Sequence, residues 1–499
     1  MRESGILMHI TSLPSPYGVG TLGKEAYRFV DFLAKAGQRY WQILPVTPTG
    51  FGDSPYQSCS TYAGNPYLID LDLLVEEGLL KKSEIGKISW SEDPTRVDFG
   101  RLYTHRAKVL RLAFRRFRET EKLEEFCCGN ESWIWEFAMF MALKDAAGGK
   151  PWYQWADPLK FRDDAALTEA WHTYREEIRY HCFVQYLFEK QWEALRAYAR
   201  EKGVKIIGDV PIYVPLDSAD VWSNPHLFQL DEKLDPVAVA GCPPDGFNAD
   251  GQLWGNPLYR WQAHKQENFA WWVRRMGAAG SRYDMVRLDH FRGFESYWAV
   301  PYGDATARGG KWVPGPGLDF VNAMHTQLPD VSMIAEDLGF LTQEVKDLLQ
   351  ASGYPGMKVL LFAFDSREPS DYSPHSYVSH SVCYTGTHDN VTTRQWFDTA
   401  PKAAVKYARQ YMNISREEGD VWGTIRTAMA TVSDLCIIPM QDYLELGADA
   451  RMNFPGTQSS SNWTWRAEKG YLSAALSKRI YRLTELYGRL EIEKEETNG

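Results

Sequence analysis

Seven short segments of the chain are almost entirely apolar, and polar residues gather between them. Such runs are typical of strands covered on both faces, as in a parallel sheet, whereas a half-exposed strand alternates apolar and polar residues. The runs occupy Tyr40–Val46, Val204–Val214, Met285–Phe291, Val331–Asp337, Met357–Phe364, Ser381–Asp389 and Asp434–Leu444. A further run at Pro66–Leu71 supplies an eighth candidate strand.

The segments between these runs show helical spacing. In Lys24–Ala36 the apolar residues Phe29, Phe32 and Leu33 recur at intervals of three and four, which predicts an amphipathic helix. The segment Ser415–Leu435 opens with Ser415-x-x-Glu418, a capping-box pattern that predicts a helix start at Ser415. Eight parallel strands alternating with helices predict the α/β class and a (β/α)8 TIM barrel.

Two stretches are longer than ordinary connections in such a barrel. Residues 72–200 predict a mostly helical, charged insertion, and residues 215–275, rich in Pro, Gly, Asn, Asp and Trp, predict a loop-rich insertion over the active site. Neither an internal repeat nor a low-complexity linker interrupts the chain. We therefore expect residues 1–499 to form a single catalytic barrel with these two insertions.

Three of the apolar runs end on a carboxylic acid. They deliver Asp289, Glu336 and Asp389. Parallel strands of a barrel present their chemistry at their C-terminal ends, where the loops gather side chains into one cleft. Two carboxylates that face one bond are the minimum equipment for glycoside cleavage, and a third can hold the substrate.

The surroundings of each acid suggest a role. Residues two apart in a strand point to the same side, so the Arg287 cation should keep Asp289 ionised, as a nucleophile requires. The apolar approach to Glu336 should desolvate it and favour the protonated form that a general acid needs. His388 and Asp389 supply a hydrogen-bond donor and an anion after the turn at Gly386. Each motif taken alone also fits a structural ion pair or exposed acids at a strand end.

Other chemistries lack their motifs. No second histidine stands at a ligand spacing such as HxxxH, and no GxSxG, GxGxxG or Walker A sequence occurs. We therefore expect no metal and no organic cofactor, because two carboxylates suffice for the reaction.

Composition narrows the choice of partner. The formal net charge is −10, without a basic block, which argues against nucleic acid and anionic membranes and favours a neutral substrate. Aromatic residues make up 14% of the chain, and their flat faces suit the C–H faces of sugar rings, although most aromatic side chains of a large protein fill its core.

The cysteines and the apolar runs bear on the compartment. Seven cysteines without paired spacing predict free thiols. No signal peptide and no apolar run long enough to cross a membrane are evident, so we expect a cytoplasmic protein.

Longer motifs add a family resemblance. The three acidic motifs, in this order, resemble those of the α-amylase clan. The stretches Gly52–Leu71 and Cys242–Trp261 resemble the amylomaltases of glycoside hydrolase family 77, which are 4-α-glucanotransferases, also called disproportionating enzymes. Supporting similarity lies in HITSLPSPYGVGTLG, Gly208–Trp222, Tyr354–Lys358 and Ala450–Arg466, so it spans nearly the whole chain. The resemblance implies a compact barrel with no separate C-terminal β-domain.

The resemblance also implies residue roles. Asp289 would be the nucleophile, Glu336 the acid/base and Asp389 the third carboxylate, which holds sugar hydroxyls. The residues expected to contact the substrate are Ser54, Tyr56, Asp209, Asp245, Phe247, Gln252, Trp254, Arg287, His388 and Asn462. The implied partners are α-1,4-glucans: maltose, maltotriose, maltodextrins and starch. Oligomeric state is not readable from the sequence.

The chain departs from the family pattern at two positions. Many relatives carry Tyr where this chain has Phe51 and again where it has Gly246. We expect a looser loop at residues 246–247, and product sizes that change on Gly246→Tyr substitution.

Two other functions remain open from the residues alone. An α-glucan hydrolase would use the same three acids, because only the acceptor side distinguishes transfer from hydrolysis. A non-enzymatic glucan-binding barrel would typically lose one of the acids, and all three are present.

Overall fold

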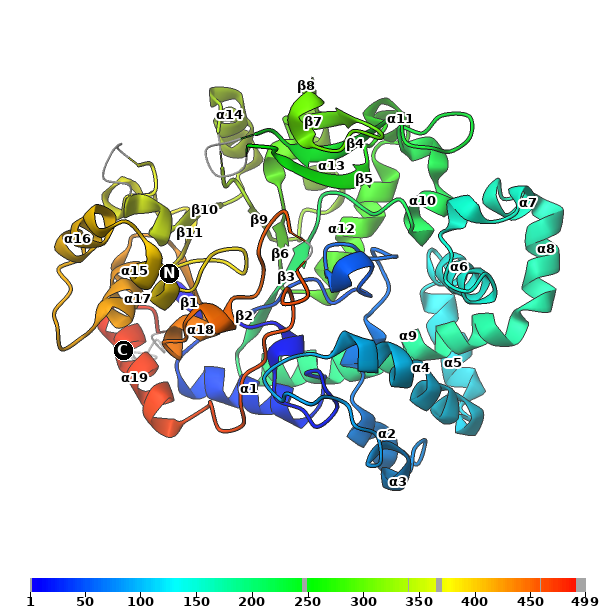
Figure 1. Cartoon of the computed structure of the whole chain (residues 1–499), viewed down its shortest axis with the longest axis horizontal. Coiled ribbons are helices and arrows are strands. Elements are labelled where there is room, and N and C mark those ends of the chain that lie inside the picture. The colour runs from blue at the N-terminus through cyan, green and yellow to red at the C-terminus, as the bar shows by residue number, and fades with distance from the viewer. Residues whose placement is uncertain (1, 245–248, 340, 365–369, 458, 491–499) are drawn as a thin grey trace, which may run out of the picture.

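The computed structural model describes residues 2–244, 249–339, 341–364, 370–457 and 459–490. Its centre is a closed barrel of eight parallel strands, with helices around it (Figure 1). Around the barrel the order is β1 (Glu3–Leu7), β12 (Leu435–Pro439), β11 (Ser381–Tyr384), β10 (Gly356–Val359), β9 (Met333–Ala335), β6 (Met285–Leu288), β3 (Lys205–Val210) and β2 (Tyr40–Gln42). The predicted (β/α)8 barrel is confirmed.

Seven of its strands lie within the seven predicted apolar runs or begin one residue before them. The ladders are shorter than the runs and end before the acidic residues, so that Asp289 and Glu336 each follow a strand by one position. The strand β6 pairs with β3 on one side and β9 on the other, with Arg287 opposite Asp209 and Ile334. This register brings the acid-bearing ends to one rim of the barrel.

The predicted strand at Pro66–Leu71 is wrong. Residues Pro66–Leu68 form a single 3-10 turn, and helix α2 (Leu71–Glu76) starts directly after it. The side chains of Asn65 and Asp70 cap these two elements, and Gln191 of the long helix α9 (Arg175–Glu201) bonds both backbone groups of Asp70. The eighth strand is instead β1, at the start of the chain.

The predicted helix at Lys24–Ala36 is confirmed as α1 (Lys24–Lys35). The helix predicted to start at Ser415 starts later, as α17 (Asp420–Ala430). The Ser415 hydroxyl does accept the Glu418 N–H, but the Glu418 side chain pairs with Arg426, eight residues further along, so the capping box is incomplete. Helices α1, α9, α12 (Ala270–Arg282) and α17 pack against barrel strands.

Residues 72–200 continue as a group of helices on one flank of the barrel (Figure 1). They are α3 (Lys82–Ile85), α4 (Phe99–Arg116), α5 (Thr120–Gly129), α6 (Ile134–Ala146), α7 (Asp157–Lys160), α8 (Asp164–Thr173) and most of α9. Further along the chain follow α10 (Ala219–Ser223), α11 (Trp261–Gln266), α13 (Leu318–Gln327), α14 (Gln343–Ser352), α15 (Thr393–Thr399), α16 (Lys402–Tyr411), α18 (Met440–Tyr443) and α19 (Ala474–Leu486).

A second sheet, not predicted from the sequence, lies apart from the barrel strands (Figure 1). Its four antiparallel strands run in the order β5 (Gln252–Pro257), β4 (Ala238–Cys242), β7 (Ser296–Pro301) and β8 (Lys311–Pro314). Two of them fall inside the stretch 215–275, where long loops were expected, and the hairpin between β4 and β5 contains the undescribed residues 245–248.

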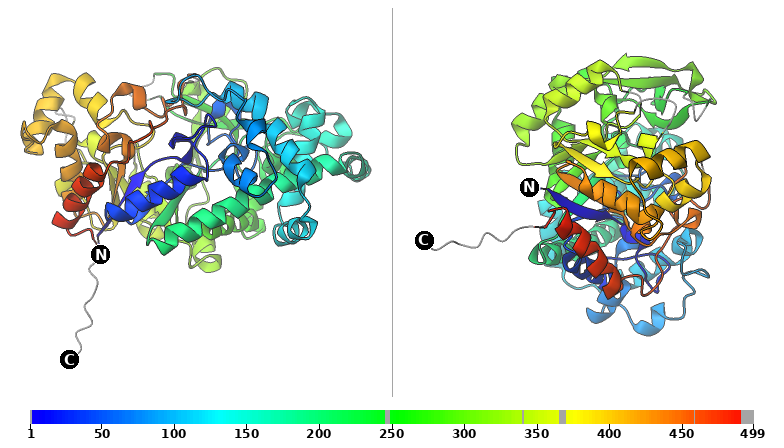
Figure 2. Two further views of the ribbon diagram at one scale, coloured as in Figure 1. Left: turned by 90° about the horizontal axis from the view of Figure 1, so that it is seen from below. Right: turned by 90° about the vertical axis from the view of Figure 1, so that its left-hand side faces the viewer.

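The start of the chain lies beside the C-terminal end of helix α19 (Figure 2). The fully buried Arg489 joins the two ends, because its guanidinium donates to the carbonyl oxygens of Glu3, Met429 and Thr431 at 2.8–3.0 Å. Within the described ranges, no helix is long and apolar enough to cross a membrane.

Candidate active site

The C-terminal ends of β3, β6, β9 and β11 carry the predicted acids. Asp209 lies within β3, Asp289 and Glu336 lie one residue beyond β6 and β9, and Asp389 follows β11 in the turn Thr385–Asn390. The backbone ties the ends together, since the Asp289 N–H donates to Val210 O and the Glu336 N–H donates to Leu288 O, both at 3.0 Å.

Arg287 connects two of these acids. Its guanidinium Nη1 lies 2.7 and 2.8 Å from the two Asp209 carboxylate oxygens and 2.9 Å from Oδ1 of Asp289. The Arg287 and Asp209 side chains are 3% and 0% exposed, whereas Asp289 keeps 26% of its side chain accessible. The buried cation therefore lies against one oxygen of Asp289, and part of that carboxyl group stays accessible.

The Glu336 carboxylate is held by two backbone groups. The His290 N–H donates to Oε2 and the Leu338 N–H donates to Oε1, each at 2.8 Å. His290 adopts a left-handed backbone conformation (φ 52°, ψ 50°), which is uncommon for a residue with a side chain. This turn directs the peptide next to Asp289 toward Glu336, so the two carboxyl groups share one backbone segment.

The surroundings of Glu336 favour its protonated form. Burial raises the pKa of the Glu336 carboxyl to about 8, and the nearby Asp289 carboxylate acts in the same direction. Arg287 and the two backbone N–H groups oppose this rise without cancelling it. At neutral pH Glu336 therefore carries a proton, while Asp289 lies against the buried guanidinium of Arg287.

Asp389 is oriented from three directions. Nδ2 of Asn453 donates to its Oδ1 at 2.6 Å, Nε2 of His388 lies 3.3 Å from its Oδ2, and Arg451 donates to its backbone carbonyl at 2.9 Å. The Asp389 side chain nevertheless stays 40% exposed. A carboxylate fixed on one side and open on the other is suited to accept hydrogen bonds from a ligand.

Tyr56 contacts both Asp209 and His388. Its hydroxyl donates to Asp209 at 2.8 Å, and its ring stacks on His388 with centroids 5.2 Å apart. Trp463 packs against both rings. Ser54 lies at the end of the preceding turn, where its hydroxyl accepts the Tyr56 N–H at 3.2 Å. The structure therefore brings Tyr56, Asp209 and His388 together, and Ser54 supports the backbone of Tyr56.

Trp254 approaches the site from the second sheet. Its ring meets the edge of His290 at a centroid distance of 4.8 Å, and its indole N–H donates to Gln252 Oε1 at 3.2 Å. Two predicted residues of the same hairpin, Asp245 and Phe247, lie outside the described residues, as does Gly246.

The Asn462 side chain is used within its own loop. Its oxygen accepts the Phe454 N–H at 3.1 Å and its amide donates to Thr457 O at 3.1 Å, and the residue is 5% exposed. Asn462 therefore fixes the segment that carries Asn453, and no free edge for a direct ligand contact is evident from these bonds.

Four site residues were not singled out from the sequence: His290, Arg451, Asn453 and Trp463. His290 follows Asp289 directly, so its place next to the site was readable from the motif. The other three lie in Ala450–Arg466, a stretch that carried the resemblance but has no periodic pattern to mark individual roles.

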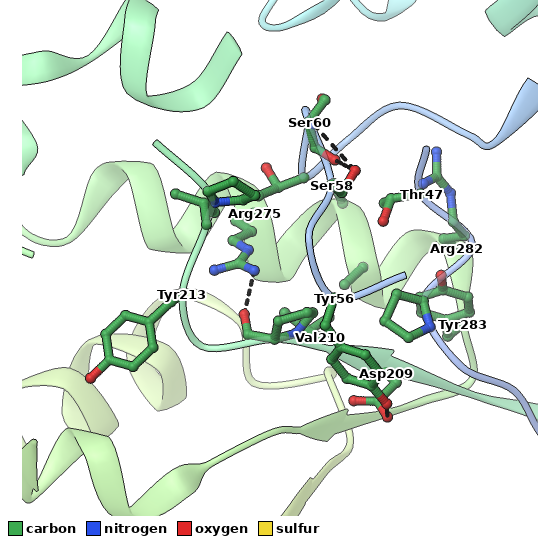
Figure 3. A pocket seen from close by; sticks show the side chains of 17 residues that line it. Thr47, Tyr56, Ser58, Ser60, Asp209, Val210, Tyr213, Arg275, Arg282 and Tyr283 are labelled. Atoms are coloured by element: carbon green, nitrogen blue, oxygen red, sulfur yellow. Dashed lines mark hydrogen bonds between the residues drawn. The ribbon is translucent and has the colours of Figure 1, made fainter. Parts of the chain in front are cut away.

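A pocket adjoins the site behind Tyr56 and Asp209 (Figure 3). Its wall comes from the loop after β2 with Thr47 and Ser58, the end of β3, and helix α12 with Arg275 and Arg282. Arg275 donates to the carbonyl oxygens of Pro211 and Ile212, which fixes the chain as it leaves β3. Within the described residues, no group of three or more His, Cys, Asp or Glu side chains is placed to hold a metal ion.

Comparisons with known proteins identify the family of this chain. The model of glycoside hydrolase family 77, described as 4-alpha-glucanotransferase, matches residues 8–472. The 4-alpha-glucanotransferase of Clostridium butyricum is 45% identical over 488 residues, covering 97% of this chain and all of that protein. The Thermus thermophilus enzyme of the same name is 46% identical over 502 residues, covering 98% of this chain and 99% of its own.

Solved structures give the same result. The amylomaltase of Streptococcus agalactiae, solved in complex with acarbose, superposes with a TM-score of 0.96 at 43% identity and covers 98% of this chain and all of its own. The amylomaltase of Corynebacterium glutamicum shares the fold at a TM-score of 0.77 and 20% identity, covering 98% of this chain and 74% of its own. The resemblance read from the motifs is confirmed: the chain belongs to glycoside hydrolase family 77, the 4-alpha-glucanotransferases.

Proposed function

We propose that this protein transfers α-1,4-glucan segments from a donor maltodextrin to the 4-hydroxyl of an acceptor glucan or glucose, with retention at the anomeric carbon. The observation that carries the proposal is the pair formed by Asp289 and Glu336. One is bound to a buried cation, the other has a pKa of about 8, and one peptide segment joins them. Retaining glycoside chemistry needs two carboxyl groups in these opposite states.

In the first step Asp289 attacks the anomeric carbon while Glu336 gives its proton to the departing glycosidic oxygen. A covalent β-glucosyl enzyme remains. The free edge of Asp289 is available for this attack because Arg287 occupies only its inner side. We expect the two carboxyl groups to stand about 5–5.5 Å apart, the separation of retaining enzymes.

In the second step Glu336, now ionised, removes the proton from the acceptor 4-hydroxyl, and the sugar oxygen displaces Asp289. Asp389 and His388 hold ring hydroxyls of the donor glucosyl unit, and these bonds strengthen as positive charge develops on the ring. The exposed edge of Asp389 and its three fixed contacts suit this task.

The acceptor decides between transfer and hydrolysis. We assign acceptor binding to Trp254 and Gln252 of strand β5, together with Asp245 and Phe247, which lie outside the described residues. Trp254 supports this assignment because it reaches His290, the neighbour of the nucleophile. An aromatic platform there binds a sugar ring and displaces loosely held water. We expect maltose, maltotriose, maltodextrins and starch as substrates.

Incubation with maltotriose tests the proposal. Glucose and longer maltodextrins at a constant number of reducing ends would establish glucan transfer. Shorter sugars with rising reducing ends would show that the same three acids work as a hydrolase, which would overturn the proposal. An unchanged sugar ladder would contradict both readings and leave a binding protein.

A further inference from the structure

A histidine outside the predicted site shares a cavity with His388. His9 follows the C-terminal end of β1 by two residues, and His388 follows the end of β11. Strand β12 lies between those two strands in the barrel, and its end supplies Pro439 to the wall of the same cavity. Both imidazoles line this space, together with Ser12 and Gln441.

The protonation of His9 follows from its contacts. Burial, together with the neighbouring His388, lowers the pKa of His9 to about 3, so its ring is neutral at physiological pH. Its Nδ1 accepts the N–H of Leu44 at 3.3 Å. A neutral imidazole has one donor and one acceptor nitrogen, so the proton of His9 is on Nε2.

The state of His388 matters because its Nε2 lies 3.3 Å from Asp389 Oδ2. To donate to that carboxylate, His388 must carry a proton on Nε2, and a neutral ring then offers Nδ1 as an acceptor. Tyr56 stacks on the ring and fixes its plane but supplies no hydrogen bond in that plane. A donor on the cavity side would select the required tautomer.

We propose that His9 is a positioning residue for the donor glucosyl site: its Nε2–H faces the Nδ1 lone pair of His388 across the shared cavity, and so keeps the His388 Nε2 proton on the side of Asp389 and the donor sugar. His9 acts through His388 and touches neither the substrate nor the reacting atoms. The inference rests on the proposed function, because it assigns Asp389 to the sugar hydroxyls.

Two substitutions test the roles of the two ring nitrogens of His9 separately. His9→Asn keeps an oxygen that can accept the Leu44 N–H but places nothing where Nε2 stood. His9→Gln reaches that place with a neutral N–H donor. We expect His9→Asn to lower kcat for maltotriose disproportionation about tenfold, with little change in KM, which is the size of effect typical of residues that contact one another. We expect His9→Gln to recover most of this loss in kcat.

The matched control is His264→Asn. His264 is another buried histidine whose pKa is lowered, to about 4, but it lies in α11 among Tyr259, Trp261 and Trp271. We expect its kcat to remain at the wild-type value. An equal fall of kcat in this control would show that loss of any buried imidazole has the same effect, and would overturn the inference.

A double-mutant cycle with Asp389→Asn gives the decisive measurement. An α-glucosyl fluoride donor keeps the slow variants measurable, because fluoride leaves without help from an acid. If His9 acts through Asp389, His9→Asn causes no further loss in the Asp389→Asn background. The same tenfold loss in both backgrounds, or equal losses in His9→Asn and His9→Gln, would overturn the positioning role. Absence of transfer by the wild-type enzyme would instead refute the proposed function.

Discussion

At the residue scale, Asp289 and Glu336 carry similar carboxyl groups in different surroundings. Asp289 contacts the buried cation of Arg287. Glu336 accepts hydrogen bonds from backbone N–H groups, and burial disfavours its charged form. A single guanidinium on one side of the pair therefore gives the two carboxyl groups the different environments that the proposed nucleophile and acid need.

The pKa of Glu336 predicts the alkaline limit of activity. A group whose pKa is raised to about 8 holds its proton below that pH and loses it above. We expect kcat/KM for maltotriose to fall above about pH 8, with the slope of a single deprotonation. Initial rates between pH 5 and 10 check this, and an activity that stays level beyond pH 9 would contradict it.

Substitution of the two acids should separate their roles. Asp289→Asn should abolish transfer from any donor, while Glu336→Gln should lower maltotriose transfer by about a hundredfold or more. With α-glucosyl fluoride, formation of the glucosyl enzyme no longer needs the acid, so Glu336→Gln should accumulate a covalent intermediate visible by mass spectrometry. Circular dichroism should show both variants folded. Wild-type turnover in either one would refute the assignment.

At the element scale, the barrel closes through β1, a strand of five residues. Gly5 lies where β1 passes between β2 and β12: a Cβ there would stand 2.4 Å from Tyr40 O and 2.8 Å from Ile437 Cδ1. The closure of the barrel therefore depends on a position without a side chain.

Gly5→Ala should lower the free energy of unfolding by about 2–3 kcal/mol, because the new methyl group overpacks the junction of three strands. Gly129→Ala, at the end of α5 with no atom within 4 Å of the added Cβ, should change it by less than about 1 kcal/mol. Urea unfolding of both variants measures the difference. Equal stabilities would show that β1 can shift to make room.

The same strand shows where prediction from sequence reaches its limit. Seven barrel strands are readable because they are long apolar runs, but β1 reads ESGIL, with only two large apolar residues. Its burial comes from pairing with β2 and β12, which no local pattern reveals. Conversely, PYLIDL looks like a strand, yet the caps at Asn65 and Asp70 turn it into helix. The three acids were predictable because each follows a strand, whereas Asn453 and His9 reach the site only through tertiary contacts.

At the scale of the whole molecule, the two ends of the chain are bound to each other. The Arg489 guanidinium donates hydrogen bonds to three backbone carbonyl oxygens. Arg2, near the other end, donates to Thr431 O and Tyr487 O at 2.8 and 2.5 Å. The segment after α19 thus holds β1 against the rest of the barrel.

Arg489→Ala should destabilise the protein by about 3 kcal/mol, since it removes a buried donor from the carbonyl oxygens of Glu3 and Met429, while Thr431 O keeps its bond from Arg2. The exposed Arg482 of α19 is the matched control, and its replacement by Ala should cost no more than about 0.5 kcal/mol. Thermal unfolding followed by circular dichroism compares the two variants. A loss of similar size in both would locate the effect in α19 and not in the buried guanidinium.

Because β1 pairs with β12, the barrel can close only late in biosynthesis. Glu3 leaves the ribosome well before Leu435, its partner in the sheet. At ribosomal speeds of about 5–20 residues per second, the wait is roughly 20–90 s. Throughout that interval the side of β1 that pairs with β12 is an open edge, the kind of surface that pairs with other chains. A polypeptide released before β12 therefore has no closed barrel, and chaperones that shield the nascent N-terminal third should affect the yield of active enzyme more than those that act after release.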